Sequence, residues 1–141
     1  MTSCPPGFVV QEFVPPDVYA LCGDEAIKLM DSRVLSVLSQ MRVDYGPLVI
    51  NDWHSGGMYR YRGYRPLNCK EGAPKSQHRI GCAIDCKPVR TTVDLMRADI
   101  IKKARAGLDV YAMIGAIEEG TSWFHFDVRP RINGAVLVFR P

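Results

Sequence analysis

The chain has 141 residues, a length that predicts a single domain spanning residues 1–141. Hydrophobic residues make up 47% of it and charged residues 23%, as in ordinary globular proteins with a buried core. A net charge of +3, spread without a basic stripe, argues against nucleic acid as a partner. No window approaches the roughly 18 apolar residues of a membrane span, so we expect no membrane insertion.

The first half of the chain predicts a lead-in, a helix, a strand and a long loop. Residues 1–20 are rich in proline and predict an irregular lead-in packed on the domain. Apolar residues recur at intervals of three and four over 24–41, which predicts an amphipathic helix. A short buried strand at 48–50 follows. Residues 51–77 are polar and rich in glycine, arginine and tyrosine, and a loop of this length in a small domain is usually functional.

The second half predicts a strand at 81–87, a helix at 93–106 and a strand at 123–129. Asn133-Gly134 predicts a tight turn into a last strand, 135–139, which would complete a hairpin. This order of elements favours an α+β fold with a small, mainly antiparallel sheet and packed helices.

The five cysteines are not expected to form a disulfide framework, because their number is odd. The N-terminal residues lack the regions of a secretory signal, so we expect synthesis in the cytoplasm without a signal peptide. Cys82 and Cys86 have the spacing of a thiolate zinc pair. We favour a core interpretation instead, because strand alternation sends both cysteines and Ile84 to one face.

Two of the three histidines lie in predicted strands or directly before them, with acids on the matching faces. His78 precedes the strand whose non-cysteine face carries Asp85. Alternation along the strand at 123–129 places one set of residues on the same face: Trp123, His125, Asp127 and Arg129. Two imidazoles and a carboxylate suit Zn²⁺ bound by three protein ligands with an open position for water. We predict a zinc site of His78, Asp85 and His125. The alternative is a metal-free domain in which both histidines are ordinary polar residues.

The pattern S-x-H-x-x-G-x-A-x-D, followed further on by W-x-H-x-D, resembles the zinc D-Ala-D-Ala carboxypeptidase family. That family includes phage and bacterial L-alanyl-D-glutamate endopeptidases and shares its fold with the hedgehog signalling domain. The matching positions are Ser76, His78, Gly81, Ala83, Asp85, Trp123, His125 and Asp127. The resemblance covers about residues 45–130 and implies a hedgehog/DD-peptidase-like fold.

The resemblance also implies roles for residues outside the zinc ligands. Arg65, in Arg62-Gly-Tyr-Arg65, would hold a substrate carboxylate, which a planar guanidinium matches with two hydrogen bonds. Trp123 would form a wall of the substrate pocket, and Ser76 would either touch substrate or cap the turn before His78. Asp127 is available to orient a zinc ligand from behind.

The general base departs from the usual family pattern. Many members place a glutamate three residues before the last ligand, where this chain has Ser122. A carboxylate is needed to take a proton from the attacking water and return it to the leaving amine. We favour Glu119 over Glu118, because its distance along the chain from His125 resembles the hedgehog-type arrangement. The alternative is that both glutamates are solvated turn residues.

The resemblance therefore implies a zinc metallopeptidase that cuts peptidoglycan stem peptides at a D-Ala-D-Ala or L-Ala-D-Glu bond. A short chain of this kind fits a phage endolysin or a component of a phage particle, acting on the cell wall after release. The competing hypothesis is a zinc-containing, catalytically inactive binding or structural module of the same fold.

Overall fold

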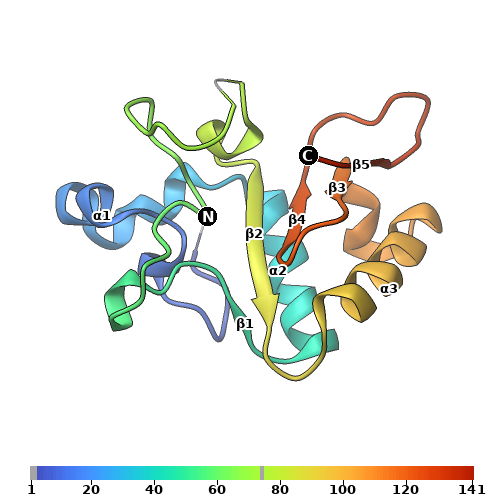
Figure 1. The fold of residues 1–141 in the computed structure, drawn as a ribbon, viewed down its shortest axis with the longest axis horizontal. Coiled ribbons are helices and arrows are strands. Elements are labelled where there is room, and N and C mark those ends of the chain that lie inside the picture. Colours follow the sequence, from blue (N-terminus) through green and yellow to red (C-terminus); the bar gives the residue numbers. More distant parts are fainter. Residues whose placement is uncertain (1–2, 74) are drawn as a thin grey trace.

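The computed structural model describes residues 3–73 and 75–141, so Met1 and Thr2 of the predicted lead-in and Pro74 of the predicted loop lie outside the described residues. Three α-helices and a five-stranded sheet make up the described part, which confirms the α+β class (Figure 1). The helices are α1 (Pro16–Cys22), α2 (Ser32–Tyr45) and α3 (Val93–Arg105). The strands are β1 (Leu48–Val49), β2 (Ala83–Pro88), β3 (Ala116–Glu118), β4 (Phe124–Asp127) and β5 (Leu137–Phe139). No helix in the described residues is both long and apolar enough to cross a membrane.

The sheet has the strand order β1-β2-β4-β3-β5 and is mixed rather than purely antiparallel. Its β1–β2, β2–β4 and β3–β4 pairings are antiparallel, and β3–β5 is parallel. The predicted turn at Asn133-Gly134 forms and is closed by an isolated Ile132–Ala135 bridge. The predicted hairpin is wrong, because β5 pairs with β3. Strand β4 is already paired on both sides, by β2 and β3, so β5 adds to the outer edge of β3.

The N-terminal half differs from the sequence prediction in two ways: part of the predicted irregular lead-in is helical, and the predicted helix over 24–41 is broken into two segments. Helix α1 begins inside the predicted irregular lead-in and ends at Cys22, beyond it, with Pro16 at its favoured first position. The predicted helix over 24–41 is a 3₁₀ segment, Gly23–Leu29, followed by α2. The break comes at Asp31, whose carboxylate accepts the Arg33 N–H at 2.9 Å and caps α2.

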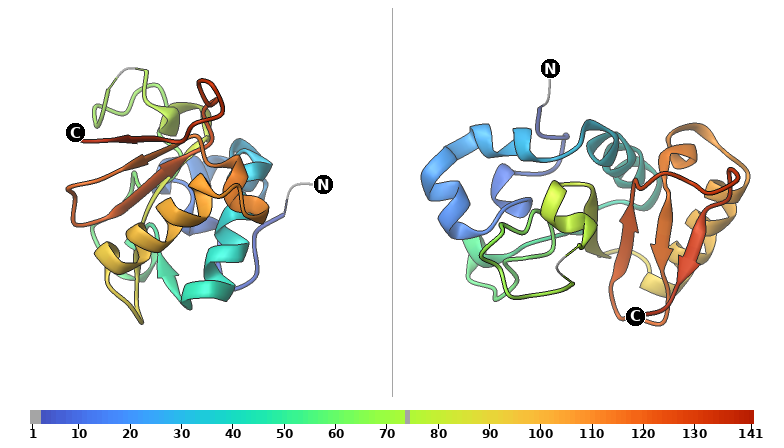
Figure 2. Two further views of the ribbon diagram at one scale, coloured as in Figure 1. Left: turned by 90° about the vertical axis from the view of Figure 1, so that its right-hand side faces the viewer. Right: turned by 90° about the horizontal axis from the view of Figure 1, so that it is seen from above.

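Helices α2 and α3 lie on one face of the sheet (Figures 1 and 2). Buried apolar side chains of both helices and of the sheet form one core there. On that face Ile84, Cys86, Phe124 and Phe126 are completely buried. Cys86 is therefore a core residue as expected, while Cys82 is only partly buried. The residues that alternate with them point to the other face, and they include the residues predicted to bind a metal.

In its described residues, the predicted loop over 51–77 contains the short 3₁₀ turn Trp53–Ser55 and runs beside β2, and its last residue begins the turn Gln77–Ile80. The Asp85 N–H donates to the Arg62 carbonyl at 2.8 Å, so the loop covers the part of β2 that β1 does not pair. This contact brings the loop residues next to the face of the sheet that carries Asp85 and His125.

Candidate metal centre

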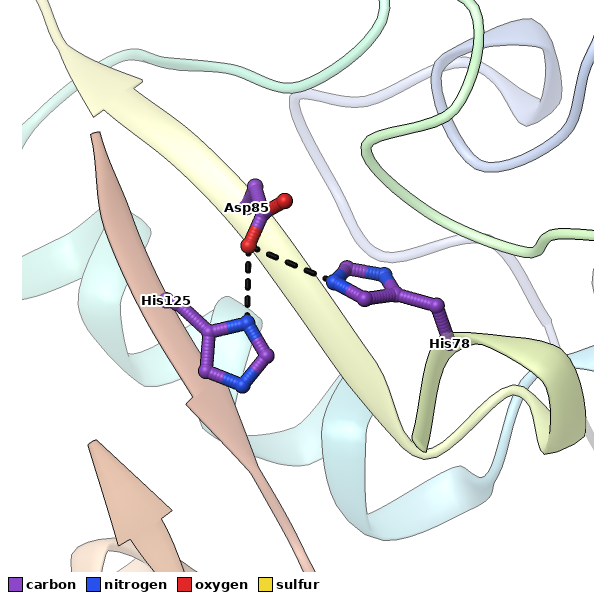
Figure 3. A group of neighbouring side chains, drawn as sticks. All are labelled: His78, Asp85 and His125. Atoms are coloured by element: carbon purple, nitrogen blue, oxygen red, sulfur yellow. Dashed lines mark hydrogen bonds and ion pairs between the residues drawn. The ribbon is translucent and has the colours of Figure 1, made fainter. Parts of the chain in front are cut away.

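The three predicted ligands come together on the face of the sheet away from the helices. His78 lies in the 3₁₀ turn Gln77–Ile80, Asp85 in β2, and His125 in β4 directly opposite Asp85 (Figure 3). Asp85 Oδ1 is 3.3 Å from His78 Nε2 and 2.8 Å from His125 Nδ1. The three ligand atoms lie within 4.8 Å of one another, and all three residues are buried. This group could hold a metal ion.

The turn that carries His78 is fixed at both ends. Ser76 caps it, because its hydroxyl accepts the His78 N–H at 3.3 Å. Gly81 ends it with a φ of 72°, a left-handed conformation that glycine adopts without strain. Of the two roles considered for Ser76, capping is therefore seen directly, and substrate contact stays a proposal.

Both imidazoles are oriented by acceptors behind them. The Nδ1 of His78 lies 2.9 Å from the Gly63 carbonyl oxygen, and the Nε2 of His125 lies 3.1 Å from Asp127 Oδ2. With an N–H on each of these nitrogens, His78 Nε2 and His125 Nδ1 are the ring atoms that face Asp85 and would bind a metal ion. Metal-bound histidines are usually held in this way, so the residues present fit a metal ion.

Arginines hold the two carboxylates that flank His125. Arg65 Nη2 lies 3.3 Å from Asp85 Oδ2, and Arg65 Nε donates to the Tyr61 carbonyl at 2.7 Å. Arg129 donates from Nε to Asp127 Oδ1 at 2.8 Å and from Nη2 to Asp127 Oδ2 at 2.6 Å. His125 thus lies between two carboxylates, each paired with a cation.

These contacts set the charge of the metal-free group. Burial would raise the pKa of Asp85, but hydrogen bonds with His125 and His78 lower it well below its ordinary value. Burial would lower the pKa of His125, but hydrogen bonds with Asp127 and Asp85 raise it to about 9. These contacts favour the protonated form of His125 in the metal-free protein, and a metal ion would compete with its proton for Nδ1.

The cluster opens into a cavity of about 560 Å³, a volume that suits a small ligand or a short peptide segment. Its walls include Arg65, Ser76 and Trp123, the three residues predicted to contact substrate. Glu118, Arg129 and Phe139 complete the wall beside His125.

Of the two glutamates considered as general base, Glu118 lies in this cavity and Glu119 does not. Glu118 is directly opposite His125 in the β3–β4 register, and its Oε1 accepts the Trp123 Nε1–H at 3.2 Å. Glu119 lines a separate hollow and pairs with Arg140 at 3.4 Å. The structure therefore does not bring the favoured Glu119 to the cluster, because neighbouring residues at the end of a strand point to opposite faces.

Arg129 and the Gly63 carbonyl are site features for which the sequence predicted no role. Alternation placed Arg129 on the face of His125 and Asp127, and in the structure Arg129 lies two residues beyond the end of β4. The Gly63 carbonyl carries no comparable signal, since any loop residue can present a backbone oxygen. Comparisons with protein-family models, curated proteins and solved structures find no match for this chain.

Proposed function

We propose that this chain is a zinc-dependent peptidase that hydrolyses a D-Ala-D-Ala or L-Ala-D-Glu bond in peptidoglycan stem peptides. The observation that carries the proposal is the buried His78–Asp85–His125 group, with both imidazoles oriented from behind and an open cavity in front. Two nitrogens and one carboxylate oxygen suit zinc. Structural zinc sites usually take four protein ligands, so a three-residue group in the described residues favours a catalytic site.

A zinc ion bound there would polarise the scissile carbonyl and make a water molecule acidic near neutral pH. Glu118 is the group that would accept the proton of this water and deliver it to the leaving amine. Its carboxylate is held on the cavity side by the Trp123 indole, and its backbone lies opposite His125. This role was expected of Glu119, and the cavity favours its neighbour.

Arg65 is proposed to hold a substrate carboxylate while it also supports Asp85. A guanidinium has five N–H groups, and Arg65 uses Nε toward Tyr61 and Nη2 toward Asp85. The remaining N–H groups are available to a ligand in the cavity that Arg65 lines. A carboxylate is the ligand group that matches this planar cation best.

The wall substrate, the hedgehog/DD-peptidase-like fold and a phage origin rest on the motif resemblance. Both motifs of this resemblance contribute residues to the candidate metal centre and its cavity: Ser76, His78, Asp85, Trp123 and His125. An endolysin or a phage-particle component acting on the wall after release is the setting that this resemblance favours.

Metal analysis and digestion of purified peptidoglycan test the proposal together. Protein purified without added metal should carry about one zinc per chain, and His78→Ala or His125→Ala should lose it. Mass spectrometry of the digest should show new stem-peptide termini, absent after treatment with a chelator. Protein without zinc affinity contradicts the metal assignment, and zinc-loaded protein that releases no peptide supports the binding-module hypothesis instead.

A further inference from the structure

Asp127 is a fully buried carboxylate behind the metal centre, and Arg129 makes most of its contacts. Asp127 Oδ1 accepts from Arg129 Nε at 2.8 Å and from the Arg129 backbone N–H at 3.2 Å. Oδ2 accepts from Arg129 Nη2 at 2.6 Å and faces His125 Nε2 at 3.1 Å. Both oxygens are therefore held by the same guanidinium, and one of them is also the partner of a metal ligand.

The neighbouring strands give Asp127 room but no side-chain donor. Ala83 of β2 and Ala116 of β3 lie opposite Asp127 on its two sides, and a methyl group cannot donate a hydrogen bond. In the described residues the hydrogen bonds to the Asp127 carboxylate come from His125 and Arg129. Without Arg129, this carboxylate would keep its burial but lose the contacts that fix its plane.

We propose that Arg129 is a positioning residue of the metal centre, acting on His125 through Asp127. By holding both carboxylate oxygens, Arg129 keeps Oδ2 in place to accept the Nε2–H of His125, and the Nδ1 lone pair then faces Asp85. The inference rests on the metal-binding part of the proposed function and is independent of peptide hydrolysis. Histidines held by a carboxylate in this way bind metals more tightly than unsupported ones.

A second contact of Arg129 supports the same ring. Its guanidinium carbon lies 5.2 Å from the centre of the Phe139 ring, and Phe139 packs edge-on against His125 with ring centres 5.8 Å apart. Arg129 thus restrains His125 from two directions, through Asp127 at the ring nitrogen and through Phe139 at the ring face. Arg129 is itself one-third exposed, so its replacement does not open the core.

The decisive experiment measures zinc affinity by competition with a chromophoric chelator. Arg129→Gln should weaken zinc binding by about 10- to 100-fold, the range found when the supporting partner of a metal-bound histidine is removed. Arg129→Lys should recover part of this loss, because lysine can donate to one oxygen but cannot hold both. In zinc-loaded protein, the ¹⁵N-edited NMR signal of the His125 Nε2–H should persist in the parent and exchange rapidly with water in Arg129→Gln.

Arg131 provides the matched control, since it is two residues further along the same segment. Its guanidinium donates to backbone carbonyls of Ile114, Ala104 and Tyr111, away from the metal centre. Arg131→Gln should lower stability yet leave the zinc dissociation constant within about twofold of the parent value.

Several outcomes would overturn the inference. Parent-like zinc affinity and an unchanged His125 signal in Arg129→Gln would show that Arg129 does not position the histidine, and so would equal losses in the Arg129 and Arg131 variants. If Arg129→Gln does not fold, Arg129→Lys and Asp127→Asn give the same readouts. A parent that binds zinc but cuts no peptide ends the hydrolytic proposal alone, whereas a parent without zinc affinity ends both.

Discussion

Gly81→Ala should destabilise the protein and displace His78, because the added methyl group meets the backbone of Leu29 at the end of the 3₁₀ segment Gly23–Leu29. A Cβ built at Gly81 would lie 1.9 Å from the Leu29 carbonyl oxygen and 2.9 Å from its carbon. Contacts under 3.0 Å are essentially never seen for real Cβ atoms, so the two backbones must separate by about 1 Å in a close-packed region. The same backbones are joined by the Asp31 N–H, which donates to the Gly81 carbonyl at 3.0 Å.

Gly134→Ala is the matched control for the conformational part of this cost. Both glycines have a φ of 72°, but a Cβ at Gly134 would meet nothing within 4 Å. The left-handed conformation alone costs about 1 kcal/mol for alanine. The clash and the stretched hydrogen bond at Gly81 add about 2 kcal/mol, which gives a total near ~3 kcal/mol.

Urea unfolding of the metal-free variants measures these free energies, and chelator competition measures zinc affinity. Gly81→Ala should lose stability and bind zinc at least about tenfold more weakly, because the turn carrying His78 must move. Gly134→Ala should lose about 1 kcal/mol and bind zinc like the parent. Equal losses of stability in the two variants would refute the clash, and parent-like zinc affinity in Gly81→Ala would refute the displacement of His78.

Four further predictions concern the site and its surroundings. Glu118→Gln should retain zinc and lower kcat by about two to four orders of magnitude, while Glu119→Gln should have little effect; steady-state kinetics on a muropeptide decides between them. Arg65→Lys should raise KM strongly, since lysine keeps the charge but loses the planar fork, and a parent-like KM contradicts that role. Burial would raise the pKa of Asp44, but hydrogen bonds from Tyr111 and other groups lower it, so Asp44→Asn should cost about 1 kcal/mol near pH 7. The difference in unfolding free energy between the parent and Asp44→Asn should disappear as the pH falls below the ordinary pKa range of aspartate. If urea unfolding gives the same difference at every pH, the ionised form of Asp44 does not stabilise the fold. Chelator-treated protein should stay folded at 25 °C by circular dichroism, in contrast to domains that zinc alone holds together.

The residues of the candidate metal centre could be predicted because strand alternation is a local property. Phe124 and Phe126 identify the buried face of β4 from the sequence alone, so His125 and Asp127 must point the other way. The same reasoning places Asp85 on the face of β2 that lies away from Cys86 and the core. Hydrophobic burial thus orients the polar residues of both strands without any knowledge of their partners.

Features that depend on competition between distant segments could not be predicted in the same way. The turn at Asn133-Gly134 is local and forms as expected, but the strand after it pairs with β3 because β4 has no open edge. The break before α2 was missed for a related reason. Apolar residues spaced three and four apart suit both a 3₁₀ segment and an α-helix, so the periodicity did not reveal that Asp31 begins a new helix.

The choice between Glu118 and Glu119 depends on the residue at which β3 ends. From the sequence alone both glutamates are turn residues, and the direction of a turn side chain is not defined by alternation. Once β3 is seen to extend to Glu118 and to pair it with His125, the two carboxylates must lie on opposite faces. The number of residues between Glu119 and His125 is therefore a poor guide to which acid lies in the cavity. Glu118 lies there because β3 ends at Glu118.

The arrangement of charges around His125 supports the prediction that this domain folds without a metal ion. Arg65, Asp85, His125, Asp127 and Arg129 form one continuous series of contacts in which cations and anions alternate. Each buried carboxylate has a cationic partner, so neither is left as an uncompensated charge, which would be strongly destabilising. In the metal-free protein, a proton on His125 would balance the two carboxylates, and a metal ion would replace it at Nδ1. These contacts would keep the proposed ligands aligned in advance, so we expect that binding of the ion does not have to supply the free energy of folding.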